Sequence, residues 1–235
     1  GKKQKALDFY NQALVIVRAS GDKAKEAGAL YNIGVIYNDW GEKQKALDYY
    51  NQALPIKHVV GDKAGVALIL NGIGFVYAGL GEPQKALDYY NQALPIFQAV
   101  GDKTGEATTL NNIGAAYSVL GEKRKALDFF NQALPIRRVV GDKAGEAATL
   151  NSIGQVYDTL GENQRALDFY NQAMPIIQAV GDKVSEAANL DSIGLIYAEL
   201  GDKEKALDYY NQALPLLQQV GDKAGEALIL NNIGL

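Results

Sequence analysis

An asparagine recurs every 40 residues along this chain, and its side chain suits contact with another polypeptide. It stands at Asn71, Asn111, Asn151 and Asn231, and Asp191 takes the same place in one copy. A carboxamide both donates and accepts hydrogen bonds, so a row of them can hold the backbone of an extended peptide. Alternatively, each asparagine bonds within its own repeat or to the adjacent one. The sequence leaves both interpretations open.

The remaining reactive residues do not assemble into a catalytic or metal site. His58 is the only histidine and there is no cysteine, so neither a thiolate metal site nor a cysteine nucleophile exists. The recurrent Gly-Asp-Lys triplets lack the Gly-x-x-x-x-Gly-Lys-(Ser/Thr) arrangement that cradles phosphates. We therefore expect no catalytic residues, no metal and no cofactor. The prediction is a protein that is not an enzyme.

Charge and hydropathy restrict the partners. The formal net charge of -4 gives no electrostatic footprint for a phosphate backbone, so we expect no nucleic acid partner. No apolar run approaches the roughly 20 residues that span a bilayer, so we expect no membrane partner. The absence of cysteine fits a reducing compartment, and we expect a cytoplasmic location. The chain begins without a methionine, and we interpret it as a piece of a longer polypeptide.

These residues are carried by an internal repeat with a strict period. The string Ala-Leu-Asp-(Tyr/Phe)-(Tyr/Phe)-Asn-Gln-Ala begins at Ala6 and returns every 40 residues, without insertion or deletion. Within a copy, apolar residues recur at steps of three and four, which indicates two amphipathic helices. Gly81 predicts a helix end in the left-handed conformation, Pro83 suits a first helical position, and Asp102 suits an N-cap. The sequence predicts an all-α protein of helix pairs.

A glycine lies inside the first helix of every copy, as at Gly74 and Gly114. Glycine costs a helix interior about 1 kcal/mol relative to alanine, so its recurrence needs a compensating gain. We expect that gain to be a close approach of the paired helix, where Ala86 and Ala126 also lack bulk. A Gly114→Leu variant is therefore expected to melt below the parent.

The spacing of the recurring glycine, alanine and apolar residues resembles that of a known repeat family. Leu110-x-x-Ile113-Gly114-x-x-Tyr117, followed by Gly121, Ala126, Phe130 and Ala133, resembles the tetratricopeptide repeat signature W-x-x-L-G-x-x-Y…A…F…A. The 40-residue period is similar to the longer repeats of kinesin light chains and of Pins-type polarity adaptors. The resemblance implies a right-handed α-solenoid of tandem antiparallel helix pairs, the tetratricopeptide superhelix. We expect residues 1–235 to form one array, with a lone second helix at 1–20 and a lone first helix at 221–235.

The resemblance also implies a concave groove lined by the first helix of each pair. At 100° per residue, the apolar stripe forms the packed face, and the asparagine column with the residues four and seven positions later forms the next face. Along that face the residue types vary while the packed face stays nearly constant. We predict a peptide-binding groove made by Asn38, Asn71, Phe75, Asn111, Ser118, Asn151, Gln155, Asp158, Asp191, Leu195 and Asn231.

The composition of this face predicts its ligand. It contains no lysine or arginine in these columns but includes Asp158, Asp191 and Glu199, so a clamp for a carboxylate is not expected. We predict a protein or peptide partner with a neutral, apolar or mildly basic segment. The main hypothesis is a protein-interaction scaffold. The alternative is a structural, self-associating or regulatory arm of a larger protein whose effector or catalytic domain lies outside this chain. Because cut repeats expose stacking surfaces at both ends, head-to-tail self-association is also expected.

Overall fold

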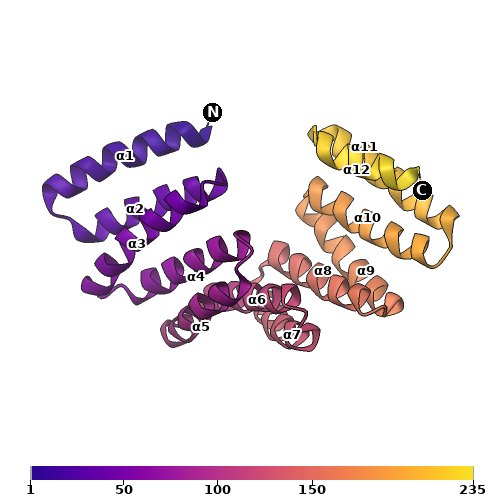
Figure 1. Ribbon diagram of the computed structural model, residues 1–235, viewed down its shortest axis with the longest axis horizontal. Helices are drawn as coiled ribbons and strands as arrows, with labels where there is room; N and C mark the ends of the chain where they lie inside the picture. The colour runs from indigo at the N-terminus through magenta and orange to yellow at the C-terminus, as the bar shows by residue number, and fades with distance from the viewer. Residues whose placement is uncertain (1, 235) are drawn as a thin grey trace. The chain divides into compact units, whose positions relative to one another are not determined.

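The computed structural model describes residues 2–234, and all regular structure in that range is helical (Figure 1). Odd-numbered helices correspond to the second helix of a repeat and even-numbered helices to the first. The twelve helices are α1 (Lys2–Ser20), α2 (Lys23–Asp39), α3 (Lys43–Val59), α4 (Lys63–Gly79), α5 (Pro83–Val100), α6 (Lys103–Val119), α7 (Lys123–Val140), α8 (Lys143–Thr159), α9 (Asn163–Val180), α10 (Lys183–Glu199), α11 (Lys203–Val220) and α12 (Lys223–Ile233).

Short polar signals set the helix boundaries as the sequence predicted. Gly81 and Gly101 have φ of 75°, a conformation that glycine adopts without steric cost. Asp102 caps α6, because its Oδ1 accepts a hydrogen bond from the backbone N–H of Gly105 at 2.9 Å. Pro83 is the first residue of α5. These positions confirm the helix ends that the repeat pattern predicted.

The helices pack as two compact units, one up to Glu122 and the other from Lys123 onward. In the first unit, each helix from α1 to α6 contacts the next one along the chain, and in the second the same holds from α7 to α12. Even-numbered helices also contact one another, as α2 does with α4 and α8 with α10. Each unit is therefore a stack of helix pairs, with an apolar core between its layers.

The recurrent glycine allows a tyrosine to lie flat against the first helix. A Cβ built on Gly74 would lie 2.6 Å from Cε1 of Tyr90 and 3.1 Å from the carbonyl oxygen of Ala86. Gly34, Gly154 and Gly194 meet the corresponding tyrosine in the same way. The close approach predicted from the sequence is present, but the neighbour that fills most of the space is the tyrosine ring rather than the alanine methyl group.

A second ring contact brings the same two helices together about one turn further along α4. Tyr77 of α4 stacks on Tyr89 of α5 with ring centroids 5.5 Å apart, and the ammonium of Lys85 lies 5.3 Å from the Tyr77 centroid. The α10–α11 pair repeats this arrangement through Tyr197 and Tyr209. Each first helix is thus fixed against its second helix at two levels, which sets the direction in which its asparagine points.

Candidate peptide-binding face

The residues predicted to bind a peptide lie on the even-numbered helices, on the side next to the packed stripe. We call this set the asparagine face. Its half-buried members are Asn38, Asn71, Asn111, Ser118, Asn151, Asp158 and Asp191, and its exposed members are Phe75, Gln155, Leu195 and Asn231. The asparagine face therefore has partly covered polar residues beside exposed side chains, which are Phe75 in the first unit and Gln155, Leu195 and Asn231 in the second.

In the first unit, the asparagine of α4 is bound by the next first helix. Oδ1 of Asn71 accepts a hydrogen bond from Nδ2 of Asn112 at 3.3 Å. The hydroxyl of buried Thr109 lies 3.2 Å from the same oxygen and 2.8 Å from the carbonyl oxygen of Gly105, and its one proton is shared between these two acceptors. Both residues belong to α6. Asn71 therefore holds α4 and α6 in register.

The second unit has an equivalent hydrogen bond, in which an asparagine, Asn189, takes the place of Thr109. Nδ2 of Asn189 donates to Oδ1 of Asn151 at 2.6 Å and to the backbone carbonyl of Tyr170 at 3.2 Å. A carbonyl can only accept, so the Tyr170 contact fixes which end of the Asn189 amide is the nitrogen. Asn151 must then present its oxygen to Asn189. One repeat later, Asp191 can only accept, and it receives Nδ2 of Asn232 at 2.8 Å.

These bonds use one end of each carboxamide and leave the other available. The Nδ2 groups of Asn71 and Asn151 have no hydrogen-bond acceptor within residues 2–234. The adjacent-repeat interpretation of the asparagine column is therefore present in the structure at both positions. It does not consume the N–H donors, which are the groups that would pair with the carbonyl oxygens of a peptide. A binding role for them remains a prediction.

Charge differs between the two units. In the second, burial raises the pKa of Asp158, and the nearby Glu199 raises it further. Burial also raises the pKa of Asp191, against the hydrogen bond from Asn232, which lowers it. Both effects reflect half-buried carboxyl groups that have no cationic partner among the residues that the structure describes. A positively charged or hydrogen-bond-donating ligand group would stabilise the ionised form of these two carboxyl groups.

In the first unit a cation reaches the face from another helix. Nζ of Lys43, in the first turn of α3, donates to Oδ1 of Asn38 at 2.8 Å and lies 6.0 Å from the ring centroid of Phe75. The columns themselves contain no lysine or arginine, as the sequence indicated. Lys43 nevertheless makes this part of the asparagine face less acidic than the corresponding part of the second unit.

The surface beside these residues is hollowed in both units. A depression of about 400 Å³ in the first unit is lined by residues that include Gly28, Tyr31 and Leu68, which is 43% exposed. A depression of about 250 Å³ in the second unit is lined by Leu195, Tyr210 and other residues of α10 to α12. Each depression has room for one or two side chains of a partner.

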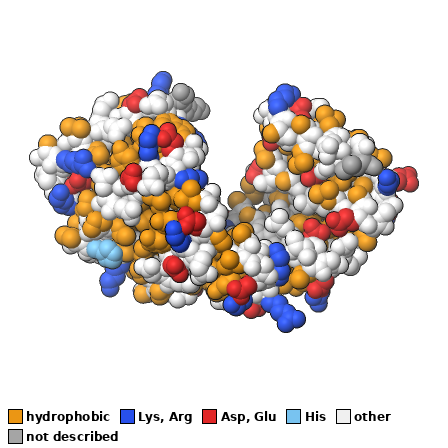
Figure 2. Space-filling model, in the orientation of Figure 1, with side chains coloured by type: hydrophobic (Ala, Val, Ile, Leu, Met, Phe, Trp, Pro, Cys, Tyr) orange, Lys and Arg blue, Asp and Glu red, His pale blue; other side chains and the backbone are white. Residues whose placement is uncertain are grey.

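Other kinds of site are not assembled among the described residues. No group of three or more histidine, aspartate or glutamate side chains in residues 2–234 is arranged to hold a metal ion. No described helix is both long and apolar enough to cross a membrane. On the face that Figure 2 shows, acidic and basic side chains are interspersed with hydrophobic ones rather than gathered into a block of one sign.

Comparison with known proteins identifies the repeat. The tetratricopeptide repeat family matches residues 1–57, 65–139 and 145–219. The chain belongs to the tetratricopeptide repeat family. A comparison with curated proteins gave no match.

Three solved structures with similar folds differ in how much of their own chain the match covers. The Podosopora anserina kinesin light chain repeats have a TM-score of 0.66 at 15% identity, over 83% of this chain and 96% of theirs. A Rap protein complexed with Competence and Sporulation Factor scores 0.74 at 16% identity, over 99% and 69%. A signal transduction ATPase from Pyrococcus horikoshii, with a tetratricopeptide repeat sensor, scores 0.81 at 20% identity. The match covers 95% of this chain but 33% of that ATPase. At these identities the likeness shows the fold.

Sequence reasoning missed the residues that orient the face. Thr109 and Asn189 occupy a position of the tetratricopeptide helix where Ile69 is found in another copy, so they read as part of the buried stripe. Their signal was a polar residue at a position that is apolar in three of the six copies, at Ala29, Ile69 and Ile229. Lys43 was missed because it belongs to the other helix of the pair, and a helical wheel drawn for one helix does not include its neighbour.

Proposed function

We propose that this chain is a protein-interaction scaffold in which each unit binds an extended segment of a partner along its own part of the asparagine face. The observation that carries the proposal is an unused Nδ2 donor in each unit, on Asn71 in the first and on Asn151 in the second, held by a bond to the next repeat. Because the orienting bonds are already made in the free protein, a peptide carbonyl would not have to reorganise the face. The tetratricopeptide repeat is generally a non-catalytic scaffold, which agrees with this role.

The ligand we propose is neutral, apolar or mildly basic. Half-buried Asp158 and Asp191 disfavour an acidic segment, and exposed Phe75 and Leu195 offer apolar contact. The similar Rap structure holds Competence and Sporulation Factor, so this fold accommodates a bound factor in at least one protein. That likeness supports the class of function and carries no information on the ligand of this chain.

The proposal is tested by removing the donors without removing the bonds that orient them. Asn71→Asp and Asn151→Asp keep an acceptor oxygen for α6 and α10, as Asp191 does naturally, but lack the N–H donors. Peptides selected from an unbiased displayed library on the parent protein serve as probes. We expect each substitution to weaken binding by about tenfold, the cost of about 1.4 kcal/mol for one or two lost hydrogen bonds.

Asn171→Asp is the matched control. Asn171 is exposed on α9, away from the asparagine face, and the substitution introduces the same charge. We expect it to leave affinity unchanged. Unchanged binding in Asn71→Asp and Asn151→Asp would contradict the proposal, as would selection of predominantly acidic peptides.

A second candidate function is a regulatory arm of a larger protein. It is favoured by the similar repeat sensor of the signal transduction ATPase, of which this chain matches one third of the length. Under this alternative the repeats would transmit a contact to an effector domain without a peptide on the asparagine face. Selection of no specific peptide by the parent protein, together with a partner that tolerates both Asn→Asp substitutions, would favour it.

A further inference from the structure

A glutamate near the start of the first helix recurs in five of the six copies and is buried in four of them. It stands at Glu26, Glu106, Glu146, Glu186 and Glu226, and in the remaining copy it is Val66. Each glutamate accepts a hydrogen bond from the lysine three residues earlier, at 2.6 to 2.9 Å. In four copies the carboxylate also receives the side chain eight residues earlier, an arginine or a glutamine, at 2.8 to 3.2 Å.

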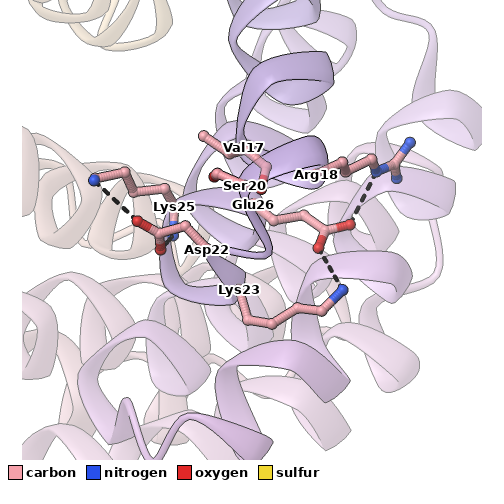
Figure 3. A network of polar contacts seen from close by, with 7 residues as sticks. All are labelled: Val17, Arg18, Ser20, Asp22, Lys23, Lys25 and Glu26. Atoms are coloured by element: carbon pink, nitrogen blue, oxygen red, sulfur yellow. Dashed lines mark hydrogen bonds and ion pairs between the residues drawn. The ribbon is translucent and has the colours of Figure 1, made fainter.

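Figure 3 shows one of these clusters closely. The carboxylate of Glu26 points between two donors: Nζ of Lys23 bonds one oxygen at 2.8 Å and Nε of Arg18 bonds the other at 2.9 Å. The hydrogen bond from Lys23, then that from Arg18, holds the pKa of Glu26 below its ordinary value. Such a two-donor arrangement is a binding site for a carboxylate, which the repeat fills with its own side chain.

The second copy keeps the donors and lacks the acceptor. Lys63 stands three residues before Val66 and His58 stands eight residues before it, at the positions of Lys23 and Arg18. Neither side chain has a hydrogen bond or ion pair among the residues that the structure describes. The neighbouring Lys57 does not supply a free cation, because it pairs with Asp62 at 2.6 Å.

The surface beside the unpaired Lys63 and His58 side chains forms a depression. His58, Lys63 and Val66 line a depression of about 450 Å³, whose remaining wall includes Pro95, Ile96 and Ala99 of α5. This volume lies in the usual range for small-molecule pockets, about 300–1,000 Å³. The wall is apolar on the α5 side and carries basic or hydrogen-bond-donating groups on the other. It lies apart from the asparagine face, since no residue of that face lines it.

We propose that this depression binds a small organic carboxylate with a short aliphatic tail. The carboxylate takes the place that a glutamate side chain occupies in the other copies, between Lys63 and His58. The tail lies against Ile96, Pro95 and Val66. Charge complementarity selects an acid over an alcohol or an amine of the same length, because Lys63 is a cation without an acidic partner among the described residues and the imidazole of His58 has an N–H to donate.

The test uses His58 as its own reporter. It is the only histidine, so its imidazole proton resonances in NMR spectra report on this site alone. Hexanoate is the probe, and hexanol is the control for tail burial without charge. We expect hexanoate to shift the His58 resonances saturably and hexanol to bind at least about tenfold more weakly. Equal binding of the two would overturn the proposal, as would His58 resonances that hexanoate does not move.

Two substitutions test whether hexanoate binds where the other copies of the repeat have a glutamate side chain. Val66→Glu restores the residue of the other copies and supplies an internal carboxylate, so hexanoate binding is expected to be lost while the protein remains folded. Lys63→Met keeps the aliphatic stem and is expected to weaken hexanoate binding by about tenfold or more. If Val66→Glu binds hexanoate as the parent does, the site is not the one described here.

A gain-of-site variant completes the experiment. Glu146→Val removes the internal carboxylate between Arg138 and Lys143 in the second unit, and so recreates the arrangement of the second copy elsewhere. Calorimetric stoichiometry with hexanoate is expected to rise from one site to two. A variant that folds but still binds a single equivalent would count against the donor pair as the recognition element.

Discussion

The contact between Gly74 and Tyr90 predicts that a single methyl group destabilises this protein. In a Gly74→Ala variant, the new Cβ would lie 2.6 and 2.7 Å from two ring carbons of Tyr90 and 3.1 Å from the carbonyl oxygen of Ala86. Ordinary contacts between carbon atoms are about 3.5–4.0 Å. Tyr90 is 1% exposed, so its ring cannot move into solvent. Either the ring or the backbone of α5 must shift.

Two effects of opposite sign set the magnitude. Replacing glycine by alanine inside a helix stabilises by about 0.5–1 kcal/mol, and overpacking a core costs about 1–3 kcal/mol. The overpacking is larger here because two ring carbons and a backbone oxygen are all too close. We therefore expect a net loss of about 1–2 kcal/mol, which for a chain of this size lowers the midpoint by about 2–8 °C.

Gly28→Ala provides the matched control in the same type of helix. A Cβ at Gly28 would meet no heavy atom within 4 Å, so only the helix propensity changes. We expect its midpoint to rise by about 1–4 °C in thermal unfolding followed by circular dichroism. In a Tyr90→Leu background, which removes the ring, the penalty of Gly74→Ala is expected to shrink. A Gly74→Ala variant that melts at or above the parent would refute the reasoning.

Three other outcomes are expected from buried or exposed groups. Arg137 is 7% exposed as a residue, and its Nε has no partner among the described residues. In an Arg137→Ile variant, its ion-pair partner Asp142, whose side chain is 30% exposed, is solvated by water and keeps the backbone N–H bond that caps α8, so the unfolding free energy should stay equal or rise by about 1 kcal/mol. Burial and Glu199 raise the pKa of Asp158, so its ionised form is disfavoured in the fold. Asp158→Asn should therefore stabilise at pH 7, with the gain vanishing below about pH 4, where the carboxyl is protonated in both states. Melting curves at pH 7 and pH 3 check both variants, and an equal gain at the two pH values would contradict the assignment for Asp158. Leu230 is 53% exposed on α12, so we expect concentration-dependent association in sedimentation that Leu230→Glu abolishes, whereas a parent that stays monomeric at millimolar concentration would exclude it.

Much of the fold follows from local signals that the sequence repeats. A glycine in the left-handed conformation, as at Gly81, and an N-cap aspartate, as at Asp102, act within a few residues of their own position. The stripe of apolar residues acts over one helix. These signals therefore predict where helices begin and end and which face is buried, and the structure confirms them.

The asparagine face was predicted only in outline. The helical wheel placed Asn71 and Asn151 beside the packed stripe, and both are half-buried there. Which end of each amide is used could not be deduced, because the donors to Asn71 lie 38 and 41 residues away in the sequence. In contrast, the missing glutamate at Val66 was visible in the repeat alignment, but its meaning required the depression that His58 and Lys63 line.

By itself, the sequence determined the period, the helix ends, the packed face and the family, since each depends on interactions within one helix or one helix pair. Only the tertiary structure decided how the first helices pair with one another. The offset between stacked helices sets whether Asn189 reaches Asn151 and which donors remain unused. That offset results from packing between repeats, where contacts such as Gly72 of α4 against the ring of Tyr50 in α3 fix distances that no local pattern encodes.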